Sequence, residues 1–157
     1  MQLGIVGLGR MGGNIARRLM AHGIETVVFD KDSNAVDALV KDRAIGARDL
    51  ADLVKRLKTP PAIWIMLPAG DITEQTIEKL SGLLGQGDTI VDGGNTFYKD
   101  DIRRGAMLRS KGIHYVDCGT SGGVWGLAHG YCMMIGGDKD VVDRLDPIFA
   151  ALAPGAG

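Results

Sequence analysis

Six residues near the N-terminus have the types and spacing needed to hold a phosphate. They form the G-x-G-x-x-G run Gly7, Leu8, Gly9, Arg10, Met11 and Gly12. The run follows an apolar stretch typical of a strand and opens a stretch with helical periodicity, the context that gives this pattern its meaning. Gly7 permits a tight turn, Gly9 leaves room for a pyrophosphate against the backbone, and Gly12 lets the helix pack closely on the strand. We therefore predict a dinucleotide site at the N-terminal end of this helix, the alternative being a glycine-rich turn without a ligand.

An acidic residue follows where ribose recognition requires one. Asp30 stands at the expected end of the second strand, roughly 20 residues after the glycine run, as is usual for this site. A carboxylate there accepts hydrogen bonds from the ribose hydroxyls and repels a 2′-phosphate, which favours NAD. Lys31 follows directly and can reach a phosphate, so NADP stays open as the alternative cofactor. Asp30 can otherwise be a loop residue or a helix cap.

Alternating strand and helix patterns position these residues. Short apolar runs predict strands at Leu3–Val6, Thr26–Phe29, Ile63–Met66, Thr89–Val91 and Tyr115–Val116, a weaker one at Ala44–Ile45, and a late one at Tyr131–Ile135. Helical periodicity covers Met11–Met20, Asn34–Val40, Leu50–Leu57, Ile72–Leu84, Ile102–Leu108 and Val141–Phe149, with a break predicted at Pro147. Unbroken aliphatic strands are typical of a parallel sheet covered on both sides. We predict an α/β fold, a Rossmann-like doubly wound, mostly parallel sheet with helices on both faces.

Composition and charge exclude several classes of function. The formal net charge is −1 and aromatic residues make up 5% of the chain, a balance that argues against a nucleic-acid partner. No apolar run approaches the roughly 18–20 residues of a membrane helix, so we expect no membrane partner. Cys118 and Cys132 lack the spacing of a disulfide framework, which predicts a cytoplasmic location and packed thiols. The three histidines are too scattered to predict a metal site.

Three glycine-rich segments resemble those of decarboxylating 6-phosphogluconate dehydrogenase, within the β-hydroxyacid dehydrogenases. They are LGIVGLGRMGGN at Leu3–Asn14, DGGN at Asp92–Asn95 and DCGTSGG at Asp117–Gly123, the last two following strands. Each is expected at the carboxyl end of a strand, where ligands bind in an open α/β sheet. The resemblance covers Met1 to about residue 150. It is closer to the shorter, often NAD-linked bacterial form, because Pro68 stands where the long enzymes usually carry lysine.

The resemblance implies an oxidoreductase of the pentose phosphate pathway and gluconate metabolism. Such an enzyme converts 6-phosphogluconate to ribulose 5-phosphate with NAD(P) as hydride acceptor, so its partner is a phosphorylated sugar acid. The implied cofactor-binding residues, besides the glycine run, are Asp30, Lys31, Met66, Leu67, Pro68 and Asn95. The implied substrate-binding residues are Asn95, Ser121, Gly122 and Gly123. From the residues alone, Asn95 can equally be a turn former and Ser121–Gly123 a plain tight turn.

The resemblance places the family's catalytic lysine and glutamate downstream, beyond Gly157. We therefore expect residues 1–152 to form a dinucleotide-binding domain without catalytic residues, and 153–157 to begin a linker to a helical domain that makes a homo-oligomer. We expect this chain to be inactive by itself. Two alternatives stay open. One is another β-hydroxyacid dehydrogenase, such as the 3-hydroxyisobutyrate type, which tends to carry serine or threonine where this chain has Asp92–Asn95. The other is a stand-alone, non-catalytic dinucleotide-binding module.

Overall fold

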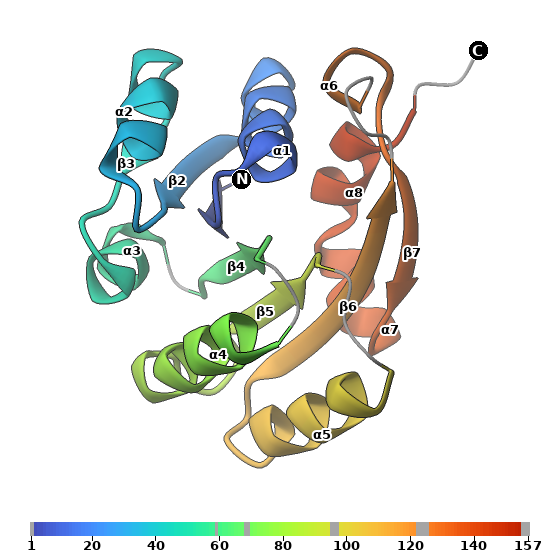
Figure 1. The fold of residues 1–157 in the computed structure, drawn as a ribbon. Coiled ribbons are helices and arrows are strands. Elements are labelled where there is room, and N and C mark those ends of the chain that lie inside the picture. The colour runs from blue at the N-terminus through green and yellow to red at the C-terminus, as the bar shows by residue number, and fades with distance from the viewer. Residues whose placement is uncertain (1, 59, 68–69, 95–97, 122–125, 155–157) are drawn as a thin grey trace.

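The centre of the fold is a mostly parallel sheet. The computed structural model describes residues 2–58, 60–67, 70–94, 98–121 and 126–154, with the backbone alone for 98–101 and 121. Its strands have the order β3-β2-β1-β4-β5-β6-β7, and only the β6–β7 pair is antiparallel (Figure 1). The strands are β1 (Gln2–Val6), β2 (Glu25–Phe29), β3 (Ile45–Gly46), β4 (Ala62–Ile65), β5 (Thr89–Asp92), β6 (His114–Ser121) and β7 (Cys132–Gly136). The predicted doubly wound sheet is confirmed.

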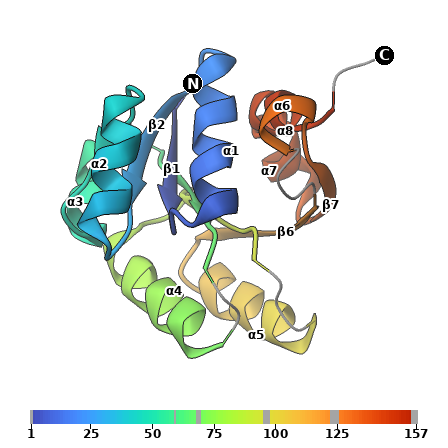
Figure 2. The same ribbon diagram turned by 45° about the horizontal axis from the view of Figure 1, so that its top comes forward.

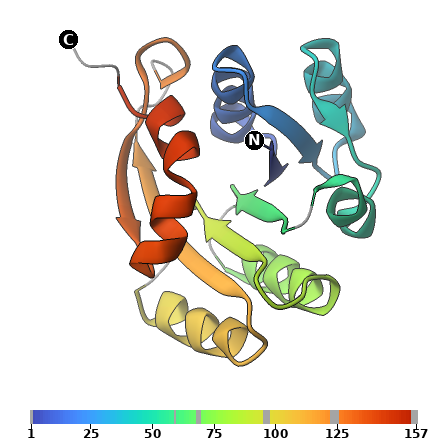
Figure 3. The same cartoon turned by 180° about the vertical axis from the view of Figure 1, so that it is seen from behind.

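Helices cover both faces of this sheet. Figure 2 shows α1 above the sheet and α4 and α5 below it, and Figure 3 shows α7 and α8 lying along β6 and β7. The helices are α1 (Arg10–Ala21), α2 (Ser33–Lys41), α3 (Leu50–Arg56), α4 (Asp71–Leu83), α5 (Tyr98–Arg109), α6 (Gly126–His129), α7 (Lys139–Arg144) and α8 (Asp146–Leu152). Among the described residues, no helix is long and apolar enough to cross a membrane.

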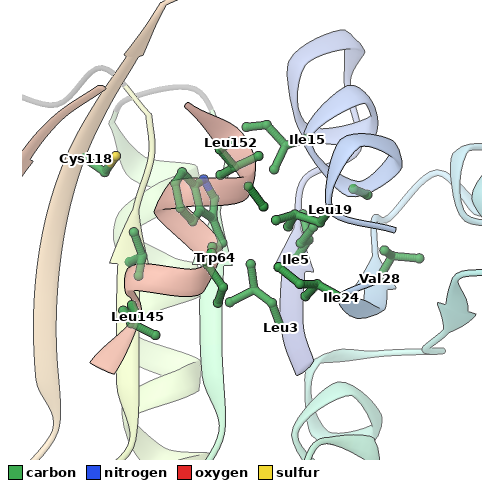
Figure 4. Packing of buried hydrophobic residues seen from close by; sticks show 14 of the residues in the cluster. Leu3, Ile5, Ile15, Leu19, Ile24, Val28, Trp64, Cys118, Leu145 and Leu152 are labelled. Atoms are coloured by element: carbon green, nitrogen blue, oxygen red, sulfur yellow. The ribbon is translucent and has the colours of Figure 1, made fainter. Parts of the chain in front are cut away.

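Alternating strand residues build two apolar layers. Because successive side chains of a strand point to opposite faces, Trp64 packs with α1 and α8 while Ile63 and Ile65 pack with α3, α4 and α5. The Trp64 ring lies 6.0 Å from that of Phe149 on α8, and Figure 4 shows Leu152 beside it. Burial on both faces explains why these strands read as unbroken aliphatic runs.

One strand extends several residues beyond its predicted end, and one predicted helix break is confirmed. The predicted strand at Tyr115–Val116 extends to Ser121, because Asp117–Ser121 pair antiparallel with β7. The expectation that Asp117 begins the segment after the strand is therefore wrong, and only the residues after Ser121 leave it. The break predicted at Pro147 is confirmed, since α7 ends at Arg144 and Pro147 lies in the first turn of α8.

The parallel strands end level with one another at one edge of the sheet. Val6 at the end of β1 pairs with Phe29 of β2 and with Ile65 of β4, and Ile65 pairs with Asp92 of β5. β1 lies between β2 and β4, so the strand order reverses there. A crevice at such a reversal, beyond the carboxyl ends of the strands, is the usual ligand site of an open α/β sheet.

Candidate dinucleotide-binding site

The turn between β1 and α1 needs glycine at two positions for steric reasons. Gly7 has φ +96°, and a Cβ there would overlap the carbonyl oxygen of Met66. A Cβ on Gly12 would overlap the carbonyl oxygen of Gly7. Gly9 differs, because a Cβ there would meet no atom within 4 Å. Gly7 and Gly12 therefore shape the turn, whereas Gly9 leaves open space in front of it.

The N-terminal end of α1 is suited to an anion. Gly9 is the N-cap residue and brings no capping side chain, and the first turn of α1 contains no acidic residue. The first N–H groups of a helix lack intrahelical partners and carry the positive end of the helix dipole. Arg10 and Met11 lie in this first turn, so their N–H groups are the ones expected to bind an anion beside Gly9. The turn can hold a pyrophosphate without further side chains.

Asp30 ties this turn to the end of β2. Its Oδ2 accepts a hydrogen bond from the N–H of Leu8 at 2.7 Å, and its Oδ1 accepts one from the N–H of Asp32 at 2.8 Å. The helix cap of α2 is Asp32, which accepts from the N–H of Asn34, so the alternative of Asp30 as a helix cap is wrong. Each carboxylate oxygen has a second lone pair, so Asp30 can still accept from a ribose hydroxyl.

A groove of about 840 Å³ runs from this turn across the sheet edge. Of the predicted cofactor residues, Gly7, Gly9, Asp30, Lys31, Met66 and Leu67 line it. Leu8, Arg10, Met11 and Gly12 form the adjoining turn and first helical turn. Pro68 and Asn95 lie outside the described residues. The glycine turn, the acidic residue and the β4 end are thus brought together around one groove.

The opposite wall of the groove was not expected from the sequence. It is formed by side chains of α3 and α4, namely Leu50, Ala51, Ile72, Gln75, Thr76, Lys79 and Leu83. Two of these, Ile72 and Leu83, are exposed apolar residues at 45% and 41%. Exposed apolar side chains that line a groove are a usable signal for an aromatic ligand group. The sequence pattern alone assigns Ile72 to the core stripe of its helix.

The ends of β5 and β6 meet the start of α1. The Thr120 hydroxyl donates to the carbonyl oxygen of Gly93 at 3.2 Å and lies 3.4 Å from the Sδ of Met11. The N–H of Gly94 donates to Asp92 Oδ1 at 3.0 Å. The three glycine-rich segments therefore converge in space. The predicted substrate residues Asn95, Gly122 and Gly123 lie outside the described residues, as does the side chain of Ser121, so their roles stay predictions.

The two cysteines differ in exposure. Cys118 is buried, and this burial, with the nearby charge of Asp117, raises the pKa of its thiol to about 12. A thiol with that pKa is not a nucleophile at neutral pH, as expected. Cys132 is exposed on the edge strand β7, so the prediction that it is packed is wrong. In the part of the chain that the structure describes, no group of three or more His, Cys, Asp or Glu side chains could hold a metal ion.

The hydrogen bonds to the Glu74 carboxylate predict that the fold loses stability in acid. Arg103 donates two hydrogen bonds to Glu74, at 2.7 and 3.0 Å, and Arg104 Nε donates a third at 2.7 Å. The bonds from Arg103, helped by those from Arg104 and opposed by burial, lower the pKa of Glu74 from 4.5 to about 2. A lowered pKa in the folded state stabilises the fold above the unfolded pKa, and this stabilisation is lost as the pH falls from about 4.5 to about 2.

We expect Glu74→Gln to reduce the loss of stability over that acid range. Wild type should lose about 1–3 kcal/mol more free energy of unfolding than the variant between pH 5 and pH 2.5. Urea unfolding at a series of pH values measures the difference. Glu78→Gln, on the exposed side of the same helix, is the matched control and should follow wild type. Equal acid losses in Glu74→Gln and wild type would contradict the prediction.

The strand order and the glycine-rich turn together define the class of domain. A sheet with this strand order and a glycine-rich turn between β1 and α1 is a Rossmann-type dinucleotide-binding domain. A sequence profile described as the NAD binding domain of 6-phosphogluconate dehydrogenase matches residues 2–156. The chain belongs to this family of NAD-binding domains.

Relatives and solved structures agree with this assignment. The chain is 42% identical over 155 residues to the NAD(+)-dependent, decarboxylating 6-phosphogluconate dehydrogenase of Haloferax volcanii, covering 99% of this chain and 51% of that protein. It is 34% identical to the NADP(+)-dependent enzyme of Bacillus subtilis, covering 97% of this chain and 33% of that protein. Plasmodium falciparum 6-phosphogluconate dehydrogenase superimposes with a TM-score of 0.93 at 26% identity, over 100% of this chain and 35% of that one.

These matches extend over only part of each relative. The chain spans about half the length of the Haloferax volcanii relative and a third of the Bacillus subtilis one. The 3-hydroxyisobutyrate dehydrogenase of Mycobacterium tuberculosis also superimposes, with a TM-score of 0.89 over 97% of this chain and 52% of that one. At 23% identity that likeness shows the shared fold alone.

Proposed function

We propose that this chain binds NAD in the groove and acts as the coenzyme-binding domain of a decarboxylating 6-phosphogluconate dehydrogenase. The observation that carries the proposal is the open space over Gly9, at a helix N-terminus without a capping side chain, with Asp30 in the same groove. When bound, NAD supplies the hydride acceptor. The reaction converts 6-phosphogluconate and NAD⁺ to ribulose 5-phosphate, CO₂ and NADH.

The described residues fit the cofactor in three separate places. The first turn of α1 offers N–H groups to the pyrophosphate, and Asp30 offers carboxylate oxygens to the ribose. The apolar side chains of α3 and α4 offer a surface for an aromatic ring. We further propose that Asn95, Ser121, Gly122 and Gly123 bind the phosphorylated sugar acid. A homo-oligomer, a cytoplasmic location and a domain boundary at residue 152 stay predictions.

Titration calorimetry of the chain with NAD tests the proposal directly. We expect one NAD per chain, with a dissociation constant in the range usual for substrates, about 1 μM to 1 mM. ATP and ribose 5-phosphate serve as controls, because each presents only part of the dinucleotide. Absence of NAD binding to the folded chain would overturn the proposal.

We expect NAD to bind roughly 10–150-fold more tightly than NADP. The Asp30 carboxylate is held by two backbone N–H groups, so it cannot swing away from a 2′-phosphate at the ribose. Its repulsion, reduced by solvent and salt, is worth about 1–3 kcal/mol. Lys31 lines the same groove and opposes this effect. Calorimetry with both cofactors measures the ratio.

Two matched variants separate the charges that set this preference. Asp30→Asn keeps the shape of the side chain and removes the charge, so the preference for NAD should shrink. Lys31→Ala removes the opposing charge, so the preference should grow. NADP binding as tightly as NAD in the wild-type chain would contradict the assignment of Asp30.

A further inference from the structure

A buried ion network lies behind the sheet edge and outside the groove. Arg104 of α5 donates from Nε to Glu74 of α4 at 2.7 Å and from Nη1 to Oδ2 of Asp92 at 3.4 Å. The Tyr115 hydroxyl donates to the same Oδ2 at 3.2 Å. The side chains of Arg104 and Asp92 are only 2% and 1% exposed. Among the described residues, the groove lining includes none of these four.

Asp92 connects the network to the backbone turn that follows β5. The second oxygen of Asp92, Oδ1, accepts from the N–H of Gly94. This turn is closely enclosed, because a Cβ on Gly93 would overlap Trp64 Nε1 and a Cβ on Gly94 would lie 2.7 Å from the carbonyl oxygen of Leu67. The carboxylate of Asp92 thus joins Arg104 and Tyr115 on one side to the backbone of the Gly93–Gly94 turn on the other.

A contribution to stability is a weak explanation for the buried ion pair of Arg104 and Asp92. Enclosing a guanidinium and a carboxylate away from water has a large desolvation cost, and apolar residues of similar volume often stabilise a fold as well or better. Burial acts to lower the pKa of Arg104, but the hydrogen bond and charge of Glu74 outweigh it and raise that pKa, so Arg104 stays charged. Among the described residues, ion pairs join Arg103 and Arg104 to Glu74, and Arg104 also to Asp92.

We propose that Arg104 is a positioning residue that fixes, through Asp92, the Gly93–Gly94 turn leading into Asn95, and so holds the end of β5 against the bound cofactor. This inference rests on the proposed function and concerns the same site. The guanidinium suits the task because its fixed fork reaches Glu74 and Asp92 in two directions at once. A lysine at this position supplies the charge from a single nitrogen and cannot reproduce both bonds.

Amide hydrogen exchange and NMR of the chain test this role at Gly94. In Arg104→Lys we expect a folded chain in which the Gly94 amide exchanges about tenfold faster, because its acceptor is no longer held in place. The amides of Gly7 and Gly12 should exchange as in wild type. Arg56→Met is the matched control: Arg56 also donates from Nε to a carboxylate, that of Asp52, but on exposed α3. It should leave the Gly94 amide unchanged.

Addition of NAD tests whether the positioned turn serves the cofactor. In the wild-type chain, NAD should shift the amide resonances of both Gly9 and Gly94. In Arg104→Lys, NAD should shift the Gly9 resonance as in wild type, and the Gly94 resonance by less than half of its wild-type shift. A general loss of stability would not affect the two resonances so differently. If Arg104→Lys does not fold, Asp92→Asn replaces it, because it keeps an acceptor for Gly94 and removes the charge that Arg104 binds.

The failures of the two proposals are distinguishable. If NAD shifts the amide resonance of neither Gly9 nor Gly94 in the wild-type chain, the proposed function fails. If NAD shifts the amide resonance of Gly9 but not that of Gly94, the cofactor binds, and the proposal that the Gly93–Gly94 turn is held against it is overturned. Unchanged Gly94 exchange in a folded Arg104→Lys chain overturns the role of Arg104.

Discussion

Gly9→Val is expected to abolish dinucleotide binding while leaving the chain folded. The new side chain enters the space that is free of any atom within 4 Å of a Cβ on Gly9, where a pyrophosphate has to approach the α1 N–H groups. The two methyl groups of the valine keep the phosphate oxygens beyond hydrogen-bond distance of the α1 N–H groups. Loss of two charge-assisted hydrogen bonds costs about 3–6 kcal/mol, a fall of more than about 100-fold in affinity.

The fold should tolerate this change because the backbone at Gly9 is ordinary. Its φ of −64° and ψ of −171° are open to any residue, so the cost is that of a poorer helix N-cap, about 1 kcal/mol. Calorimetry with NAD and thermal unfolding of the same sample measure both effects. A Gly9→Val chain that binds NAD as wild type does would show that the pyrophosphate does not lie over this turn.

Gly12→Val is the matched control with the opposite expectation. Its Cβ would overlap the carbonyl oxygen of Gly7, so the turn has to move before the helix can pack. Overpacking against backbone of this kind costs about 3 kcal/mol or more. We therefore expect a clear loss of thermal stability in Gly12→Val and little in Gly9→Val. Equal losses would contradict the assignment of Gly12 to packing and Gly9 to the ligand.

The glycine turn was predictable from sequence because its requirements are local. Gly7 needs a positive φ and Gly12 needs the absence of a Cβ, and both needs are met by residues within one strand–turn–helix unit. The apolar runs likewise predicted the sheet, since a strand buried on both faces carries its signal within four or five residues.

Features that depend on distant partners were not predictable in this way. The bond from Leu8 to Asp30 and the one from Arg104 to Glu74 join residues that are far apart in the chain and meet only through the order of the strands. The extension of β6 depends on pairing with β7. In the sequence, Arg103 and Arg104 look like two solvated charges, but α5 turns one of them toward solvent and the other inward.

The polypeptide of 157 residues, prepared by itself, is expected to bind NAD and to produce no NADH from 6-phosphogluconate. Oxidation of the C3 hydroxyl requires a base that removes its proton as the hydride leaves, and the enediol left after loss of CO₂ requires an acid. The resemblance implies a lysine and a glutamate for these roles, and it is a prediction that no residue of this chain fills either of them. Each such group contributes about 10²–10⁴-fold to the rate.

The described charges near the site are not placed to substitute for that pair. Those lining the groove belong to Asp30 and Lys31 after β2, and to Asp49 and Lys79 of the wall formed by α3 and α4. At the end of β5, Asp92 is enclosed and already holds Gly94 and Arg104. A carboxylate bonded on both oxygens and shielded from the groove is not free to exchange protons with a substrate.

Absorbance of NADH after mixing chain, NAD and 6-phosphogluconate measures the outcome. Calorimetry on the same sample must first show NAD bound, so that a missing signal reports on the chemistry and not on an empty groove. The Haloferax volcanii relative serves as the positive control for the assay. Turnover by this chain at ordinary enzyme rates, about 1–10³ per second, would mean that a complete acid–base pair lies within these 157 residues. In that case Asn95, Ser121 and their neighbours would have to be reconsidered as catalytic groups.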